Sequence, residues 1–404
     1  MPTFQLFDGL AHASLRPLTA LRPVADLRVG LYTAQERWRR WTGSEAIPFS
    51  HPALRPFHPA RETAERLLVA AAALPHDSSI AARITGLGAN HALLHDGRLL
   101  AARVDVELAE EVVAGGPLPD SLERIDYTGA VDWLERPHDL FARNAAQLER
   151  DLIDLGRGDE RERLAATNTV IGEYPVFVEP DVVCEASTLD VREGPIFLGR
   201  EAQVMPGCLL RGPLALCAHS TFKMGAKVYG GTTVGPHCKV GGEVQNVVFQ
   251  GYANKGHDGY LGNAVIGRWC NLGADTNASN LKNNYGEVRQ WDYSAGRFVP
   301  TGLQFCGLVM GDHAKCGINT MFNTGTVVGT SANVFGAGFP RAFVPDFAWG
   351  GAGGFTTYDI AKALDTAARV VARRGLELTE ARAGALRAAY AATAVYRRWE
   401  GSPS

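Results

Sequence analysis

The sequence has neither a strong excess of one charge nor a long apolar run. Its 404 residues carry a net charge of −3, which argues against a general polyanion binder, since a nucleic-acid surface normally shows a basic excess or a basic stripe. No apolar run reaches the roughly twenty residues that a membrane helix needs, and no basic-plus-apolar signal opens the chain. We therefore expect a cytoplasmic protein with no membrane and no nucleic-acid partner.

Paired cysteines are missing as well. None of the seven cysteines stands in a Cys-x-x-Cys pair, and several fall at positions of the repeat described next. We interpret them as small buried hydrophobic residues rather than ligands or disulfides, which suits a reducing compartment. The apolar content of 46% with 21% charged residues is typical of a soluble globular protein.

A six-residue repeat dominates the middle of the chain. Between Leu198 and Val240 an aliphatic or aromatic anchor returns at every sixth position, and the pattern resumes from Met310 to Val334. This period indicates a parallel β-helix, in which three hexads make one coil and positions eighteen apart stack on each other. The anchors are Leu198, Val204, Leu210, Leu216, Phe222, Val228, Val234 and Val240, then Met310, Cys316, Phe322, Val328 and Val334.

The first 160 residues lack this repeat. Residues 4–7 and 99–104 are interpreted as strands and residues 64–73 as a helix, and such alternation indicates an α/β domain. A helical run over residues 140–155 is expected to lead into a linker. Because a domain usually has about 150 residues, two or three domains are expected.

Beyond Val334 a segment rich in Gly and Pro, residues 336–354, is expected to leave the β-helix. Two amphipathic helices should follow over residues 357–374 and 380–399, the first of them ending at Gly375. The predicted organisation is therefore an α/β domain over 1–160, a β-helix over 161–355 and a helical segment over 356–404.

Two stretches break the six-residue register, residues 243–261 and 276–308. Loops that interrupt a solenoid normally project from one face and often carry the binding function. Both stretches are rich in Asn, Gly and Tyr, and the first contains His257. We therefore expect the site at these interruptions.

Residues 256–267 carry a motif that resembles a known family. Gly256-His257, then Tyr260-Leu261-Gly262, then Asn271-Leu272-Gly273-Ala274 match in order and spacing the acetyltransferase domain of the GlmU family, the bifunctional uridylyltransferase/glucosamine-1-phosphate acetyltransferases. The spacing of coils continues from residue 310 to 329. The resemblance implies a left-handed parallel β-helix, acetyl-CoA as co-substrate, and a homotrimer whose sites are shared between neighbouring subunits.

The resemblance also assigns roles to single residues. His257 would be the general base, a role that suits imidazole because its pKa lies near neutrality; the alternative is that His257 is an ordinary polar residue of the loop. Lys223 stands where the family has an Arg for the substrate phosphate, and Lys239 or Lys255 would supply the second cation. The acceptor would be held by Tyr260, Asn271, Asn284 and Tyr285, and acetyl-CoA would lie near Ala274, Ile318 and Ala337.

A pair of histidines suggests a competing interpretation. His219 and His237 are eighteen positions apart, so they should stack on neighbouring coils, and β-helices with stacked histidines can bind zinc, as in γ-class carbonic anhydrases. A catalytic zinc needs a third ligand, and His257 does not fall on the next eighteen-residue step. We expect a solvated histidine pair and no metal.

The N-terminus resembles the opening of sugar-phosphate nucleotidyltransferases. Those enzymes hold nucleotide phosphates with a Gly-rich loop that contains an Arg, followed by a Lys. Aligned on Pro17-Leu18-Thr19, this chain keeps Gly9. The lost positions are Leu10, His12, Ser14 and Val24. Without both cations we expect a nucleotidyltransferase-like domain that is reduced or inactive.

These observations predict an acetyl-CoA-dependent N-acetyltransferase of the hexapeptide-repeat type, acting on an amino sugar phosphate or a sugar nucleotide. The first alternative is a sugar-1-phosphate nucleotidyltransferase that forms a UDP-sugar, and Mg²⁺ would be required only if the N-terminal domain is active. The second alternative is a non-catalytic protein that binds a sugar nucleotide. The acceptor sugar and the acyl group stay open.

Overall fold

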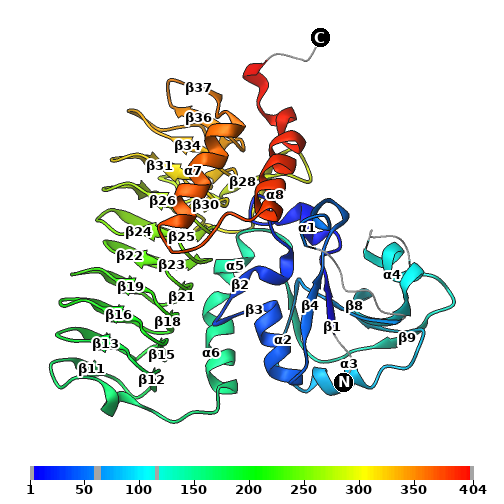
Figure 1. Cartoon of the computed structure of the whole chain (residues 1–404). Helices are drawn as coiled ribbons and strands as arrows, with labels where there is room; N and C mark the ends of the chain where they lie inside the picture. Colours follow the sequence, from blue (N-terminus) through cyan, green and yellow to red (C-terminus); the bar gives the residue numbers. More distant parts are fainter. Residues whose placement is uncertain (1–3, 59–64, 114–117, 401–404) are drawn as a thin grey trace.

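A computed structural model describes residues 4–58, 65–113 and 118–400. An α/β domain lies on one side, a parallel β-helix on the other, and two C-terminal helices run along the upper coils (Figure 1). The expected fold class is thus confirmed. Within the described part of the chain, no helix is long and apolar enough to cross a membrane.

The N-terminal domain is built on a six-stranded mixed sheet in the order β4-β1-β5-β8-β7-β9. Strand β1 pairs in parallel with β4 and β5, whereas β8 is antiparallel to β5 and β7. The strands are β1 (Phe4–Phe7), β4 (Ala46–Phe49), β5 (Glu65–Ala70), β7 (His91–His95), β8 (Arg98–Asp105) and β9 (Glu123–Asp126). Two small ribbons accompany them, β2 (Arg28–Val29) with β3 (Tyr32–Thr33) and β6 (Ala73–Pro75) with β10 (Val131–Trp133).

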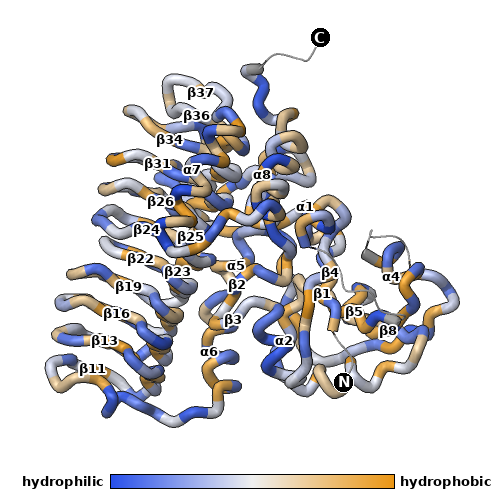
Figure 2. Tube along the Cα trace, viewed as in Figure 1, coloured by the Kyte–Doolittle hydropathy of each residue, from blue (hydrophilic) through white to orange (hydrophobic). Residues whose placement is uncertain are grey.

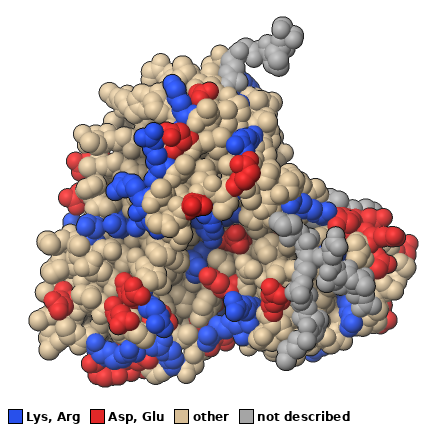
Figure 3. Space-filling view, in the orientation of Figure 1, with Lys and Arg blue, Asp and Glu red and all other residues tan. Residues whose placement is uncertain are grey.

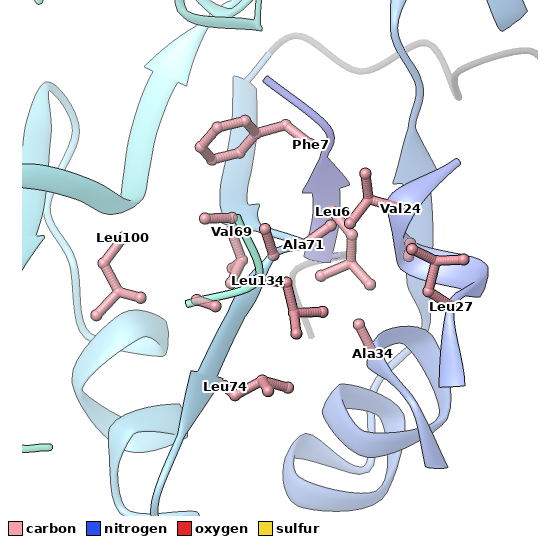
Figure 4. Close-up of a cluster of buried hydrophobic side chains, with 14 of the residues drawn as sticks. Leu6, Phe7, Val24, Leu27, Ala34, Val69, Ala71, Leu74, Leu100 and Leu134 are labelled. Atoms are coloured by element: carbon pink, nitrogen blue, oxygen red, sulfur yellow. The ribbon is translucent and has the colours of Figure 1, made fainter. Parts of the chain in front are cut away.

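Short helices cover this sheet and close its core. Thr33 and Glu36 form a reciprocal capping box at the start of α2, which satisfies backbone N–H groups that a helix start leaves free. Side chains from the central strands and from α2 converge on one apolar cluster, including Leu6, Val24 and Val69 (Figure 4). The helices are α1 (Ala11–Ser14), α2 (Ala34–Thr42), α3 (Ile80–Thr85) and α4 (Val106–Val113).

The strands predicted over 4–7 and 99–104 are confirmed as β1 and β8. The helix predicted over 64–73 is wrong from residue 65 on, because that segment forms β5 and then β6; Ala64 lies outside the described residues. β5 lies between β1 and β8, and Leu67 to Ala70 are buried. A central strand covered on both faces has a continuous apolar run, which periodicity alone does not distinguish from a buried helix.

The helical run predicted over 140–155 is confirmed as α5 (Asp139–Ala142) and α6 (Asn144–Asp154), which are separated at Arg143. α6 lies between the α/β domain and the first coils (Figure 1). Its Leu148 and Leu152 share an apolar cluster with Phe177 and Phe197 of the β-helix. The linker therefore docks on the β-helix, while the domain boundaries at 160 and 355 stay predictions.

The β-helix is a three-sided prism of parallel strands, as the repeat predicts. The first face holds β11 (Thr169–Ile171), β14 (Thr188–Asp190), β17 (Leu209–Arg211), β20 (Lys227–Tyr229), β27 (Asn277–Ala278) and β32 (Met321–Phe322). The second holds β12 (Val176–Val178), β15 (Ile196–Leu198), β18 (Leu214–Leu216), β21 (Thr232–Val234), β30 (Val309–Met310), β33 (Val327–Val328) and β35 (Phe343–Val344). The third holds β13 (Val183–Cys184), β16 (Gln203–Val204), β19 (Thr221–Phe222), β22 (Lys239–Val240), β24 (Asn254–Lys255), β26 (Asn271–Leu272), β31 (Lys315–Cys316), β34 (Asn333–Val334) and β36 (Ala348–Gly351).

The anchors of the repeat fill the prism. Every predicted anchor is buried, and Figure 2 shows apolar positions recurring from coil to coil. The pairing of Phe222 with Val240 confirms the eighteen-residue step there. All seven cysteines are free and buried, so their interpretation as small core residues is confirmed. Each coil is thereby held by the apolar contacts of its neighbours.

The first register break is not a projecting loop, contrary to the prediction. β23 (Glu243–Phe249) and β25 (Tyr260–Ile266) each run from the first face on to the second, and β23 pairs with both β20 and β21. Their coils are shorter, so Val240 pairs with Lys255 fifteen positions on instead of eighteen. Asn246 and Asn263 take positive φ within these strands, which lets the chain turn tightly.

The second register break does project. Residues 279–308 leave the prism and form the hairpin β28 (Arg289–Asp292) and β29 (Arg297–Pro300). The hairpin packs on the N-terminal domain, where Arg136 donates to Asp292 at 2.6 Å and His138 contacts Gln290 at 3.2 Å. This loop therefore joins the two domains.

The segment over 336–354 stays in the β-helix, so its predicted departure is wrong. It adds β35 and β36, and β37 (Gly354–Thr357) folds back antiparallel on β36 as a cap. Both predicted C-terminal helices are confirmed as α7 (Ile360–Ala372) and α8 (Glu380–Ala392), with Asp359 and Thr379 capping their N-termini. Both are shorter than predicted, and two 3-10 turns follow α8.

Polar contacts lock the N-terminal domain to the β-helix. Arg22 lies 2.7 Å from Asp312, and both are buried. The backbone of Arg28 exchanges two hydrogen bonds with the side chain of Gln250. Because buried polar groups must be paired, these contacts fix the orientation of one domain on the other.

Candidate functional site

A groove of about 690 Å³ lies between the third face of the β-helix and α7. Its floor comes from the coils of β22, β24 and β26, and its outer wall comes from the C-terminal half of α7. Arg374, just after α7, donates to Asn254 of β24 at 3.2 Å and ties the wall to the floor. The lining residues are Lys223, Lys239, Tyr252, Asn254, Gly256, His257, Trp269, Cys270, Asn271, Leu272, Gly273, Ala274, Lys315, Ile318, Val370, Arg373 and Arg374.

The groove is strongly cationic. Five of its lining residues are Lys or Arg and none is Asp or Glu, and Lys and Arg side chains gather between α7 and the neighbouring coils in Figure 3. Lys315 donates to the carbonyl of His313 at 2.8 Å, and burial lowers the pKa of Lys315. Positive charges at a concave surface attract and concentrate anionic ligands. This groove is therefore suited to a phosphorylated ligand.

His257 lies at the rim of the groove, in the turn between β24 and β25. Its side chain is exposed, and no described residue makes a hydrogen bond to the imidazole. Gly241 and Gly242 of the preceding coil lie directly beneath the turn: a Cβ on Gly242 would come 2.9 Å from the His257 carbonyl oxygen. The backbone of His257 is thus closely supported while its ring is free to meet a ligand.

Five residues that the GlmU resemblance singles out meet in this groove. They are Lys223, His257, Asn271, Ala274 and Ile318. Lys239 lines it as well, whereas Lys255 is buried behind the floor. The structure thus brings together the expected base, one expected acceptor contact and two expected acetyl-CoA contacts, although their roles stay predictions.

The other residues expected at the site lie elsewhere. Tyr260 is on the far side of the corner, where its hydroxyl donates to Gln245 at 3.2 Å and accepts from Asn280 at 3.0 Å. Asn284 and Tyr285 are exposed on the projecting loop, with Tyr285 67% accessible. Ala337 is exposed between β34 and β35. None of these four lines the groove of this chain.

Sequence reasoning missed Lys315 and the two arginines at the end of α7. Lys315 could have been found, because it precedes an anchor on the third face as Lys239 and Asn271 do, and residues beside inward anchors point outward. Arg373 and Arg374 reach the groove only because α7 docks there, and no local pattern signals that docking.

The predicted stack of His219 on His237 is confirmed, with ring centroids 4.6 Å apart. It is longer than expected, since Tyr252, Trp269 and His313 continue it along the same corner. Offset aromatic stacking of this kind stabilises neighbouring coils. Among the residues that the structure describes, no group of His, Cys, Asp and Glu is arranged to hold a metal ion.

The segment that corresponds to the nucleotide loop is used for packing. After β1 the chain turns at Gly9, which has φ +53°, and forms α1. Pro17 then packs against Gly311 of the β-helix, and Arg22 pairs with Asp312. The segment thus contacts the β-helix, which fits the expected loss of its phosphate-binding cations.

Two titratable groups are buried where this segment begins. Asp8 accepts hydrogen bonds from the backbone N–H groups of Val24 and His51, and burial nevertheless raises the pKa of Asp8 to about 7. His12 stacks on His51 with centroids 4.4 Å apart, and burial lowers the pKa of His12 to about 3. Both side chains are therefore neutral in the folded protein near pH 5.

This pair predicts a pH dependence of stability. Between pH 4 and 6.5 the folded state holds one more proton than the unfolded state at Asp8 and one fewer at His12, so the two contributions to the slope oppose each other. We expect Asp8→Asn to leave the His12 contribution unopposed. The melting temperature of the variant should rise more steeply with pH over this range than that of the wild type; parallel curves would contradict the prediction.

Comparison with known proteins extends these observations. Residues 4–158 match the family model described as sugar nucleotidyl transferase. The bifunctional protein GlmU of Trichormus variabilis is 27% identical over 208 residues, which cover 46% of this chain and 45% of that protein. GlmU of Gloeobacter violaceus is 33% identical over 91 residues, covering 22% and 19%. The chain thus spans less than half the length of these curated relatives.

Solved structures with partial overlap include acyltransferases. UDP-N-acetylglucosamine O-acyltransferase (LpxA) from Moraxella catarrhalis shares 15% identity over 54% of this chain and 88% of that one, with a TM-score of 0.24. AntD, an N-acyltransferase from Bacillus cereus in complex with dTDP and coenzyme A, shares 12% over 51% and 91%, with a TM-score of 0.23. Residues 4–158 are thus similar to sugar nucleotidyl transferases, and a stretch of 208 residues is similar to part of GlmU.

Proposed function

We propose that the chain is an acetyl-CoA-dependent N-acetyltransferase that acts on an amino sugar phosphate or a sugar nucleotide. The observation that carries the proposal is the groove itself, in which His257 lies at the rim of a surface with five cations and no carboxylate. Both ligands of such a reaction bear phosphates, and both need a cationic surface. The sequence similarity to GlmU supports the same reaction class.

The residues in the groove suit each step of acyl transfer. The amine nitrogen of the acceptor attacks the thioester carbonyl, the C–N bond forms, and His257 takes a proton from that nitrogen. The C–S bond then breaks and the thiolate of CoA leaves, to be protonated by the imidazolium or by water. Lys223 and Lys239 would hold the acceptor phosphate, while Ala274 and Ile318 would contact the donor. General-base catalysis of this kind contributes about 10²–10⁴-fold.

The test is the release of CoA. Purified protein is given acetyl-CoA with glucosamine 1-phosphate, and then with a panel of amino sugars, amino sugar phosphates and amino-sugar nucleotides, and free thiol is followed with a thiol reagent. We expect acceptor-dependent release with at least one phosphorylated acceptor. If no acceptor in the panel yields free CoA, the proposed function fails.

The arginines after α7 give a second prediction. Arg373 and Arg374 face the groove, whereas Arg369 on the same helix is exposed and paired with Asp365 at 2.9 Å. We expect the double variant Arg373→Ala/Arg374→Ala to raise KM for a phosphorylated substrate about tenfold or more, since a charged hydrogen bond contributes about 1.5–3 kcal/mol. Arg369→Ala is the matched control and should keep KM. Equal KM values in all three proteins would contradict the prediction.

A homotrimer with sites shared between neighbours belongs to this proposal. Leu209 and Met224 are 53% and 72% exposed, and a partner subunit would cover such apolar side chains. Tyr260, on the far side of the corner from the groove, could then meet a ligand held by the neighbouring subunit. Size-exclusion chromatography coupled to light scattering measures the oligomeric state. A fully active monomer would contradict a site shared between subunits.

A second activity, sugar-1-phosphate nucleotidyl transfer with Mg²⁺, is favoured by the family match over residues 4–158. The loss of the loop cations at Ser14 and Val24 argues against it. Nucleotide-dependent formation of pyrophosphate from a sugar 1-phosphate would support this activity. If neither CoA nor pyrophosphate is released while a sugar nucleotide still binds, the chain is a binding protein.

A further inference from the structure

Lys255 occupies a core position of the β-helix. Strand pairing places it beside Val240 on the preceding coil, and on the third face the corresponding residues of other coils are apolar. They are Val204, Phe222, Val240, Leu272, Cys316 and Val334. Lys255 is 1% exposed, so its four-carbon chain and its amine both lie inside the prism.

The amine of Lys255 binds two backbone carbonyls. Nζ donates to the oxygen of Gly241 at 3.0 Å and to the oxygen of His257 at 3.0 Å. No carboxylate among the described residues lies within ion-pair distance, although Asp258 and Asp275 exert a weaker field on it. Burial lowers the pKa of Lys255 to about 8. A buried ammonium without a carboxylate partner is costly, so this position is not explained by stability.

The two carbonyls belong to consecutive coils at one corner. Gly241 ends the third face of one coil, and His257 is in the turn directly above it. Lys255 therefore bridges the supporting coil to the turn that carries the histidine. Gly242 also lies close beneath the His257 carbonyl. The backbone of His257 is thus packed between Gly242 and the amine of Lys255.

We propose that Lys255 is a positioning residue, which fixes the turn of His257 so that the imidazole meets the acceptor amine at the rim of the groove. Lys255 does not line the groove, and its amine acts only through the His257 backbone. The inference therefore rests on the proposed function of His257. A shift of about 1 Å in a catalytic group can cost about 100-fold in rate.

The test replaces the amine and keeps the volume. Lys255→Met puts a flexible apolar chain into an apolar core, so we expect a melting temperature equal to or above that of the wild type. We expect kcat to fall about 100-fold while KM for both substrates stays within about twofold, because the groove cations are untouched. Lys362→Met removes an exposed lysine of α7 as a matched control and should behave as the wild type.

Amide hydrogen exchange supplies a readout that does not depend on activity. In Lys255→Met, residues 256–259 should exchange faster, with the other coils unchanged. An unchanged kcat in an active enzyme, or unchanged exchange at the turn, overturns the inference. If Lys255→Met and Lys255→Gln both fail to fold, Lys255 is a structural residue and the inference also fails. If the wild type releases no CoA, the proposed function fails, and the exchange result alone decides whether Lys255 holds the turn.

Discussion

Replacing His257 by Asn or Ala is expected to lower kcat for acetyl transfer by about 10²–10⁴-fold, the usual contribution of a general base. Binding of CoA should persist, because the five cations of the groove remain. The measurements are steady-state CoA release and calorimetric binding of CoA. Loss of rate with retained binding would show that the imidazole acts on the chemical step.

The control for this experiment is another histidine of the same β-helix. His219 is also exposed, and it lies outside the groove at the end of the aromatic stack. His219→Asn should therefore keep wild-type kcat. The hypothesis would be wrong if both variants lost equal activity, or if His257→Ala released CoA as fast as the wild type.

Replacing Arg22 by Met is expected to lower the free energy of unfolding by about 3–5 kcal/mol, the usual cost of leaving a buried charge without its partner. Arg22 and Asp312 are both buried and lie 2.7 Å apart. Burial raises the pKa of Asp312 even with Arg22 beside it, which shows how poorly this position tolerates a lone carboxylate. Thermal unfolding should therefore begin several degrees lower than in the wild type.

A second variant separates the lost charge from lost packing. In Arg22→Met/Asp312→Asn the carboxylate at position 312 is gone as well, and an amide oxygen can still accept from the Arg268 backbone N–H. The double variant should be more stable than Arg22→Met alone. Arg39→Met, an exposed residue of α2, serves as the control. A melting curve of Arg22→Met that coincides with the wild type would refute the prediction.

The β-helix was predictable because its core repeats at a fixed period. Each anchor of the register, such as Val204 or Phe222, faces inward in the structure. The prediction failed where the chain departs from that fixed period. The run Val247-Val248-Phe249 is apolar because β23 crosses a corner between two packed faces, and a loop was predicted because the period changed there. A change of period marks a shorter coil as readily as a projection.

The site was only half predictable for a related reason. The floor of the groove is local, so the motif around His257 and Asn271 identified it. The wall depends on where α7 docks, and docking is decided by contacts between segments far apart, such as Arg374 with Asn254. Lys255 was one of two candidates for the second phosphate-binding cation, but the shortened coil moves it into the core, a shift that becomes visible only in the strand register.

The core that the two domains share also affects the order in which the chain folds during synthesis. Val248, Val265, Val309 and Val327 of the β-helix belong to the same apolar cluster as Phe4 and Leu6 of the first strand. A ribosome releases the N-terminal residues first, yet their apolar partners are synthesised some 240 to 320 positions later. Contacts of such high sequence separation form slowly. We therefore expect the N-terminal domain to complete its packing only after most of the β-helix has emerged.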